Sequence, residues 1–345
     1  MRIVYGVQST GKGHLSRLLG LLPLFRRDGH ELFILVTGRW DPPQYFLDAI
    51  SGVPYRRFPG LPMVANGTGG ISKRGTVKAF ATRWPGLFNS FGKAHRLISA
   101  FDPDFIVSDF DPVTGSPFVA PGVFKVGIGN YFTQTRADVE HPAGFWRDRF
   151  NVRVVDKLVT SGLDVRFGCH FYPLDDVCLP PILRPETLAI VPENHGHLLV
   201  YHAFPGLLGP VVAYAARHSS TPVIVYGHRA RTRGLPDNVR FELDPNRFLD
   251  DLACCSAFVG TAGFQSIAEA FYFGKDLVVQ PIEGHYEQTW NAIEVEKHGM
   301  GRWCHDDLEA ALDQSFNEAL HTQLVPWYQS GAERHYEQIL CAVPR

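Results

Sequence analysis

The sequence predicts an α/β protein made of two Rossmann-like domains, each built on a doubly wound parallel sheet. A chain of 345 residues is long for one hydrophobic core and suits two domains of ordinary size. Short β-branched segments alternate with amphipathic segments over nearly the whole length, which is the pattern of parallel strands joined by helices. Pro180, Pro181 and Pro185 interrupt this alternation, because proline disfavours both continuous helix and central strand. We therefore expect a linker there, between two halves of similar architecture.

The first half begins with a complete strand–helix–strand unit. We expect strands at residues 2–7 and 31–37 and a helix at residues 14–27 between them. Gly29 is placed to end this helix, whose apolar face consists of leucines at positions 15, 18, 19 and 22. The remaining strands are expected at residues 105–108, 123–128, 197–202, 223–226, 239–242, 257–260 and 277–281.

These elements divide the chain into four expected segments. They are an N-terminal domain at residues 1–178, a linker at 179–195, a C-terminal domain at 196–325 and a last helical segment at 326–345. In open parallel sheets ligands bind at the carboxyl ends of the strands. The loops that follow the strands are therefore where functional residues are sought.

Composition excludes some classes of partner. The net charge is −2, from 33 basic and 35 acidic residues, so no basic excess favours nucleic acid. No apolar run reaches the roughly 18 residues that a membrane-spanning helix needs, although peripheral membrane contact stays open. Six cysteines show no CxxC spacing and are expected to be reduced. Because the first expected strand begins at Arg2, we expect no signal peptide and a cytoplasmic protein.

The most informative stretch is Gly-Thr-Ala-Gly-Phe-Gln-Ser-Ile-Ala-Glu-Ala at residues 260–270. It follows an expected strand and opens a helix, whose first-turn amides have no partner within the helix. Such a helix start binds phosphate through these amides and its partial positive charge. Downstream, Glu287 and Gln288 occupy the next junction between strand and helix, and so are expected on the same rim.

This stretch resembles the donor-binding signature of the glucuronosyltransferase-like enzymes and of the lipid-linked N-acetylglucosaminyltransferase of peptidoglycan synthesis. These are GT-B glycosyltransferases, in which two such domains face each other across a cleft. The resemblance covers the chain in outline and residues 260–292 in detail. It implies an inverting, metal-independent transfer from a nucleotide sugar, most simply a UDP-sugar, with no further cofactor.

The resemblance also implies a donor-binding set in the C-terminal domain. The glutamate matching Glu269 bonds the donor ribose, and the pair matching Glu287 and Gln288 bonds sugar hydroxyls. Thr261 departs from the pattern, because many relatives have a phosphate-binding histidine there. The expected donor-binding residues are Gly11, Gly13, Thr261, Ala262, Gly263, Phe264, Gln265, Ser266, Glu269, Glu287 and Gln288.

His14 is the expected catalytic base. It follows Gly11, Lys12 and Gly13 after the first strand, where the related enzymes place a catalytic histidine. Histidine suits this role because its unperturbed pKa lies near neutral pH. In the glucuronosyltransferase-like branch an aspartate after a later strand orients this histidine. Asp109 matches that placement and is the expected partner, with Asp111 as the nearby competitor.

Other interpretations of the first half stay open. Residues 6–14 come within one residue of a P-loop, but Gly13 stands where a P-loop needs Ser or Thr for magnesium. A P-loop-like phosphotransferase is therefore an alternative, as is a catalytically silent nucleotide-sugar-binding protein. Asp109-Phe110-Asp111 spells a DxD metal motif, yet we expect no metal site because it lies in the half opposite the donor motif.

The acceptor is left undefined by the sequence. A small molecule, a lipid-linked molecule or a glycan would each supply a hydroxyl, and the pocket is expected to draw on residues 58–74, 84–95 and 131–146. Arg229, Arg231 and Arg233 could supply a charge to the pyrophosphate, but a solvated basic loop is the favoured interpretation of at least two of them.

Overall fold

The computed structural model describes residues 1–344 apart from residues 10, 39–40, 61–71, 203–207, 228–233, 306 and 314–315. The described chain divides into two compact units. The first runs from Met1 to Pro185 and takes in the C-terminal segment from Trp327, whereas the second is Glu186–Pro326.

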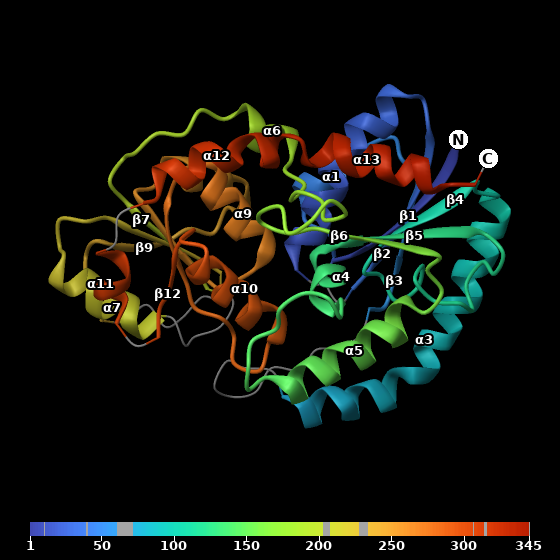
Figure 1. Ribbon diagram of the computed structural model, residues 1–345, viewed down its shortest axis with the longest axis horizontal. Coiled ribbons are helices and arrows are strands. Elements are labelled where there is room, and N and C mark those ends of the chain that lie inside the picture. Colours follow the sequence, from blue (N-terminus) through green and yellow to red (C-terminus); the bar gives the residue numbers. More distant parts are fainter. Residues whose placement is uncertain are drawn as a thin grey trace. The chain divides into compact units, whose positions relative to one another are not determined.

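The first unit contains a six-stranded parallel sheet with the order β3-β2-β1-β4-β5-β6 (Figure 1). The reversal of order between β1 and β4 is the topological switch point of a doubly wound sheet. The strands are β1 (Arg2–Gln8), β2 (Glu31–Thr37), β3 (Tyr55–Phe58), β4 (Phe105–Asp109), β5 (Phe124–Gly129) and β6 (Val165–Gly168).

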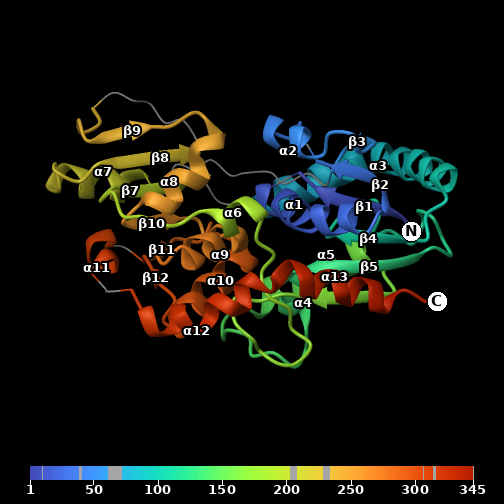
Figure 2. The same ribbon diagram turned by 90° about the horizontal axis from the view of Figure 1, so that it is seen from above.

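The second unit repeats this topology. Its parallel sheet has the order β12-β11-β10-β7-β8-β9, which is the same winding with the switch point between β7 and β10 (Figure 2). The predicted fold class, two doubly wound parallel sheets, is therefore confirmed. The strands are β7 (Leu198–His202), β8 (Val223–Gly227), β9 (Val239–Phe241), β10 (Ala257–Gly260), β11 (Asp276–Val279) and β12 (Arg302–Trp303).

Thirteen helices are assigned in the described part of the chain. The first unit holds α1 (Lys12–Arg27), α2 (Gln44–Ala49), α3 (Lys73–Phe101), α4 (Asn130–Thr135), α5 (Trp146–Thr160) and α13 (Gly331–Ala342). The second unit holds α7 (Leu208–Arg217), α8 (Phe248–Cys254), α9 (Phe264–Tyr272), α10 (Tyr286–Lys297) and α11 (Leu308–Leu312). The helices α6 (Pro185–Ala189) and α12 (Glu318–Gln329) contain the unit boundaries. No helix in these described stretches combines the length and the apolar character that crossing a bilayer requires.

Both faces of the first sheet are buried, and alternate residues of a strand enter different cores. Ile3, Tyr5 and Val7 of β1 pack in the core that includes α1 and α13, whereas Val4 packs in the core that includes α3. This division follows from the two-residue period of a strand. Burial on both faces also explains why β1 and β2 are continuous apolar runs in the sequence.

The last helix packs on the first. Tyr336 of α13 lies edge-on to Phe25 of α1 at 5.3 Å between ring centroids, and its hydroxyl donates to Asp28 at 2.6 Å. His335 of α13 is fully buried, and its Nε2 donates to the carbonyl of Pro180 at 3.0 Å. The C-terminal segment is thus part of the first unit's core.

Three edge strands were not predicted. β3 and β6 have four residues each and β12 has two, and all three lie at sheet edges. An edge strand has one neighbour and one solvated side, so its sequence need not be apolar. In β3, for example, Arg56 and Arg57 are both exposed.

Candidate active site

The switch point of the first sheet brings two predicted residues together. His14 lies in the first turn of α1, directly after β1, and Asp109 is the last residue of β4. β1 and β4 are neighbours, with Val7 paired to Asp109 in the register. The two side chains therefore meet at the carboxyl edge of the sheet, where a doubly wound fold binds its ligands.

A third residue, Arg17, completes this group. His14 Nδ1 lies 2.8 Å from Asp109 Oδ1, while Arg17 donates from Nε to Oδ2 at 2.8 Å and from Nη2 to Oδ1 at 2.5 Å. The Arg17 and Asp109 side chains are 3% and 0% exposed, whereas the His14 side chain is 22% exposed. Only the histidine of the three is open to solvent, so it is the member that a ligand could reach.

The charge on Asp109 determines the state of the histidine ring. His14 Nδ1 also lies 2.6 Å from Arg17 Nη2, but guanidinium nitrogens only donate, and Nη2 already donates to Asp109 Oδ1. A lone pair on Nδ1 facing the carboxylate oxygen would be repelled by it. The arrangement therefore favours a proton on Nδ1, which leaves the lone pair of a neutral ring on Nε2.

Arg17 keeps Asp109 ionised in a buried position. Burial alone would raise the pKa of Asp109, but the charges of Arg17 and His14 and the hydrogen bonds from both outweigh it and hold this pKa below its usual value. The bidentate geometry suits a planar guanidinium and would not be reproduced by lysine. The same pairing raises the pKa of Arg17 despite the opposing effect of its own burial.

Arg17 is a residue that the sequence analysis missed. It lies one turn after His14 on α1, between Leu15 and Leu18, which are both buried. Its position among the leucines of an apolar helix face was the available signal, because arginine is almost never fully buried without a partner.

Asp111 has a different environment from Asp109. Its Oδ1 accepts from the Thr37 hydroxyl at 2.5 Å, and its Oδ2 accepts from the Thr114 amide at 2.7 Å and the Thr114 hydroxyl at 2.6 Å. Gly6 of β1 leaves the space for this group, since a Cβ there would lie 2.0 Å from Thr114 Oγ1. Asp111 thus joins β2 to the turn after β4 and does not contact His14.

Phe110 separates the two aspartates by its backbone conformation. It has φ 49°, in the left-handed region that costs a non-glycine residue about 1–2 kcal/mol. Its ring packs 4.2 Å from that of Tyr131, measured between centroids. The two carboxylates consequently serve different partners, and the DxD spelling does not correspond to a shared pair of ligands.

The predicted phosphate-binding turn lies in the second unit, between β10 and α9. Gly263 is the N-cap of α9 with φ −74°, a conformation open to any residue, and it has no side chain that could cap the helix. A Cβ on Gly263 would meet its nearest neighbour, Ser266 Oγ, at 3.4 Å, which is ordinary contact. Neither backbone strain nor crowding in the fold therefore requires glycine at this position.

The other residues of this motif are mostly buried. Ala262 and Phe264 are apolar and buried, and Thr261 is 7% exposed. Glu269 is 3% exposed, and its Oε1 accepts from Gln265 Nε2 at 3.1 Å. This carboxylate is therefore held on α9 by a residue one turn earlier on the same helix.

The junction after β11 lies next to this turn, because β10 and β11 are neighbouring strands. Asn291 Nδ2 of α10 donates to the carbonyl of Ala262 at 2.9 Å, which ties α10 to the turn before α9. Glu287 and Gln288 are half-buried in the first turn of α10. Gln288 accepts from the Ile282 amide at 2.9 Å, so its oxygen also supports the loop.

His285 was not predicted, although it lies within the same junction. It is the N-cap of α10, and its Nδ1 accepts from the Gln288 amide at 3.4 Å. A proton on this ring therefore belongs on Nε2. The sequence signal was available, since His285 directly precedes the first turn that carries Glu287 and Gln288.

Some predicted residues cannot be placed in this geometry. Gly11 is the N-cap of α1 with φ 95°, which favours glycine, and Gly13 follows in the first turn. Neither Gly11 nor Gly13 lies in the unit that holds the turn before α9. Arg229, Arg231, Arg233 and residues 61–71 of the expected acceptor loop lie outside the described residues.

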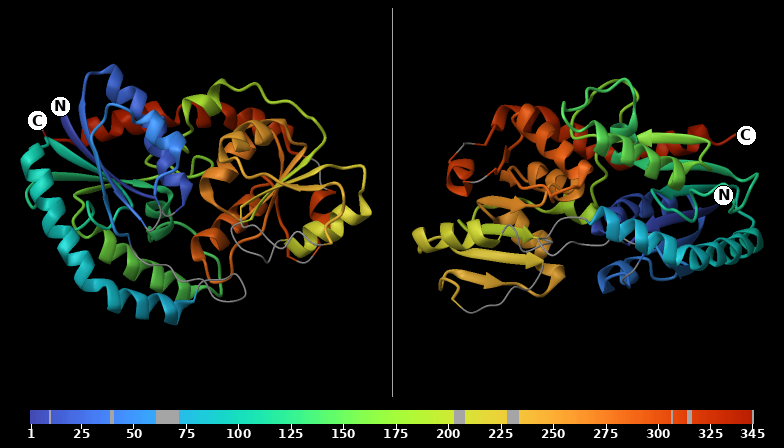
Figure 3. Two further views of the ribbon diagram at one scale, coloured as in Figure 1. Left: turned by 180° about the vertical axis from the view of Figure 1, so that it is seen from behind. Right: turned by 90° about the horizontal axis from the view of Figure 1, so that it is seen from below.

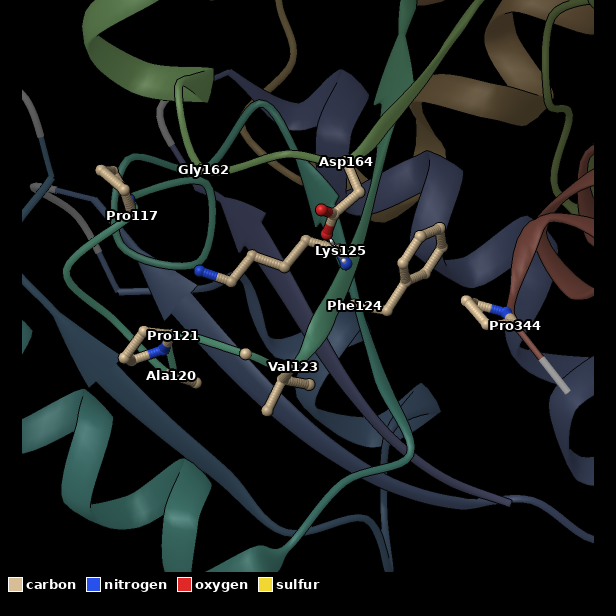
Figure 4. Close-up of a pocket in the computed structure, with 10 residues that line it drawn as sticks. Pro117, Ala120, Pro121, Val123, Phe124, Lys125, Gly162, Asp164 and Pro344 are labelled. Atoms are coloured by element: carbon tan, nitrogen blue, oxygen red, sulfur yellow. Dashed lines mark hydrogen bonds between the residues drawn. The ribbon is translucent and has the colours of Figure 1, made fainter.

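A cavity of about 420 Å³ lies elsewhere, at the amino end of β5. Figure 4 shows the Lys125 side chain reaching from β5 toward the turn at Pro117. Its ammonium donates to the carbonyls of Ser116 and Val119, and burial lowers the pKa of Lys125 to about 8 despite the charge of Asp164. The cavity lies at the edge of the sheet where β5 begins, whereas His14 lies at the opposite edge, where the strands end, so the cavity is separate from the candidate site.

One group of possible metal ligands occurs among the residues that the structure describes. Glu193, His195 and Cys254 place one ligand atom each within 4.8 Å of one another. Glu193 and His195 are exposed, and their side chains are already paired at 2.7 Å. Cys254 lies just before β10, so the group lies at the opposite edge of the sheet from the turns that follow β10 and β11.

Comparisons with known proteins agree with this architecture. The model of a family described as glycosyl transferase family 1 matches residues 1–321. A protein named as an uncharacterized glycosyltransferase of Methanosarcina mazei is 24% identical over 343 residues, which cover 88% of this chain and 85% of that protein.

Solved structures show the same fold. The glycotransferase of kitacinnamycin has a TM-score of 0.67 and 17% identity, with 99% of each chain covered. The glycosyltransferase SsfS6 of Streptomyces sp. SF2575, complexed with thymidine diphosphate, has a TM-score of 0.62 and 15% identity, with 98% of this chain and 99% of that chain covered. The chain therefore belongs to glycosyl transferase family 1 and is a glycosyltransferase with the GT-B fold.

Proposed function

We propose that this glycosyltransferase moves a sugar, with inversion and without a metal ion, from a UDP-sugar to an acceptor hydroxyl. The observation that carries the proposal is the contact between His14 Nδ1 and Asp109 at the switch point of the first sheet. It leaves Nε2 of a partly exposed ring available to accept a proton. The finer grouping with glucuronosyltransferase-like and peptidoglycan N-acetylglucosaminyltransferase-like enzymes is part of this proposal.

The proposed reaction is a direct displacement at the anomeric carbon. His14 Nε2 takes the proton of the acceptor hydroxyl as its oxygen forms the new bond to that carbon. The bond from the carbon to the pyrophosphate oxygen breaks, and the nucleoside diphosphate leaves with the electron pair. Asp109, kept ionised by Arg17, stabilises the imidazolium that forms on His14.

The donor site is proposed at the start of α9. The partial positive charge of a helix N-terminus stabilises the negative charge that develops on the leaving pyrophosphate. The fold itself does not require glycine at position 263. A ligand that lies close to the backbone would explain why glycine occupies this position. Glu269 is proposed to bond the donor ribose, and Glu287 and Gln288 to bond the sugar.

The nucleotide is proposed to be uridine diphosphate, with thymidine diphosphate as the second candidate. SsfS6, a structural neighbour, is complexed with thymidine diphosphate. Both nucleotides offer the same pyrophosphate to the α9 turn and differ in the base and at the 2′ position of the sugar ring. We also propose a cytoplasmic location and no cofactor beyond the donor.

Turnover is expected to survive chelation, because helix amides rather than a divalent ion neutralise the leaving group. The measurement is UDP release from UDP-glucose, UDP-glucuronic acid and UDP-N-acetylglucosamine with phenolic, polyprenyl-phosphate and oligosaccharide acceptors, in EDTA and in magnesium. Equal rates are predicted. Complete loss of turnover in EDTA, restored by manganese or magnesium, would contradict metal independence and favour a metal-assisted mechanism.

A further inference from the structure

Helix α5 presents its apolar side chains to solvent. Five large apolar residues of this one helix are between 41% and 68% exposed, namely Trp146, Phe150, Val154, Val155 and Leu158. They make up nearly half of the eleven large apolar side chains that are exposed in the described part of the chain. At 3.6 residues per turn they fall on one side of the helix, so they form a continuous face rather than scattered positions.

The opposite side of α5 holds the helix on the first unit through polar as well as apolar contacts. Val159 is 1% exposed, and Asp156 is 8% exposed, with its carboxylate accepting from the Thr160 hydroxyl of the same helix at 3.0 Å. The carbonyl of Val152 accepts from the Tyr131 hydroxyl at 2.9 Å. The usual arrangement of a surface helix, with apolar residues inward and polar residues outward, is thus reversed in part.

Cations accompany this apolar face. Arg147 and Lys157 are exposed between the apolar residues, and Arg153 is half-buried at the edge of the face. Of the two acidic residues of α5, Asp156 is buried, and Asp148 is half-buried at the edge of the face next to Val155, across the face from Arg153. We name the outward set of Trp146, Arg147, Phe150, Asn151, Val154, Val155, Lys157 and Leu158 the α5 face (green helix in Figure 3).

We propose that the α5 face lies on an anionic phospholipid surface. A helix that binds in the membrane interface has large apolar side chains on one side and lysine or arginine beside them. Such apolar side chains enter the boundary between head groups and acyl chains, while long cationic side chains reach the phosphates. The α5 face offers both features together. This proposal goes beyond the sugar transfer and does not depend on it.

Other occupants fit the α5 face less well. A second copy related by twofold symmetry would place the cations of both copies in one interface, which like-charge repulsion opposes. Nucleic acid would pair with the cations but leave five large apolar side chains without a partner. An apolar acceptor would account for the apolar residues but gives Arg147 and Lys157 no function. A phospholipid surface satisfies both kinds of side chain.

The test is flotation of the purified full-length protein with vesicles of phosphatidylcholine alone or with phosphatidylglycerol added. Binding is expected only with the anionic lipid and should weaken as salt rises. Phe150→Asp should lower vesicle affinity at least about tenfold, as expected for an apolar side chain kept from burial. Arg147→Glu combined with Lys157→Glu should abolish the preference for anionic vesicles.

Two control variants match these changes at exposed sites away from α5. Val191→Asp introduces the same charge at an exposed apolar residue, and Lys297→Glu reverses a cation on α10. Both should bind vesicles like the parent, and thermal unfolding should show every variant folded. Absence of parental binding to anionic vesicles, or equal binding by Phe150→Asp, would overturn the proposal. A parental dimer that Phe150→Asp dissociates, without vesicle binding, would assign the face to a second copy instead.

Discussion

His14→Ala is expected to lower turnover by about 10²–10⁴-fold, which is the usual contribution of a positioned general base. Donor affinity should change little, because the proposed donor site lies in the second unit while His14 lies in the first. The measurement is kcat together with the dissociation constant of UDP for parent and variant. A loss confined to kcat is the signature of an interaction made in the transition state.

Two further variants make this prediction specific. Asp109→Asn should lose less turnover than His14→Ala, because it disturbs the orientation and charge of the ring but leaves the base in place. His195→Ala removes an exposed histidine of the second unit and should turn over like the parent. If His14→Ala keeps the parental rate, the acceptor proton goes elsewhere and the turn after β1 has a structural role only.

Arg17→Met is expected to destabilise the fold by about 3–5 kcal/mol, because it leaves the buried carboxylate of Asp109 without its guanidinium. Methionine fills much of the space of the arginine stem, so loss of packing contributes less than loss of charge. The measurement is the free energy of unfolding from denaturant titration, with the unfolding of each unit followed separately.

The loss of folding stability in Arg17→Met should depend on pH, and the pKa of Asp109 gives the direction. In the parent the pKa of Asp109 is depressed, so its contribution to stability is present above the unfolded pKa of about 4 and is lost as pH falls. Without Arg17, burial raises that pKa, and the stabilising contribution is then lost as pH rises. The deficit of the variant relative to the parent should therefore grow between about pH 4 and pH 7.

Comparison with the parent matters because His335 also titrates in this range. Burial lowers the pKa of His335 to about 4, so stability falls in parent and variant alike as the pH decreases below the unfolded value of about 6.5. The difference between the two proteins removes the part of this contribution that comes from burial, while the part that the Arg17 charge produces is lost in the variant. Three other titratable groups interact electrostatically with Arg17 or Asp109, namely Tyr5, Cys169 and His335.

Matched variants separate the effect of an unpaired buried charge from the effect of losing an arginine side chain. Arg17→Met combined with Asp109→Asn should recover much of the stability, since no buried charge is left unpaired. Arg136→Met removes an arginine that bridges Asp138 and Asp175 in a more exposed position, and should cost no more than about 1 kcal/mol. A deficit that is independent of pH, or equal for Arg17→Met and Arg136→Met, would contradict the role given to Arg17.

The sequence was sufficient for the central strands and for the edge strand β9, and insufficient for the other three edge strands. β1, β2 and the strands near each switch point are buried on both faces, so their apolar runs stand out against the intervening helices. β3, β6 and β12 are short and solvated on one side, and their residues resemble those of loops. These segments are strands because they pair with a neighbouring strand, and the local sequence pattern does not indicate this pairing.

The candidate site was predictable where position along a strand determines it. The carboxyl end of β4 places Asp109 beside the turn that carries His14, so topology and motif together predicted this pair. The role of Arg17 depends on its contact with Asp109, which is 92 residues away in the sequence. The helical pattern of α1 alone does not distinguish Arg17 from the other residues of that helix. The separate environment of Asp111 likewise depends on Thr37 and Thr114, which spacing alone does not bring together.

We propose that the turn between β10 and α9 holds the nucleoside diphosphate of a sugar donor. The decisive measurement is titration calorimetry of UDP and TDP with the parent, Glu269→Ala and Glu269→Gln, with thermal unfolding to show that each variant is folded. The parent should bind one of the two nucleotides, and Glu269→Ala should bind it about 10–150-fold more weakly, as a lost hydrogen bond to a charged group predicts. Glu269→Gln should fall between them. Equal affinity of parent and Glu269→Ala, or no binding of either nucleotide to the parent, would contradict the claim.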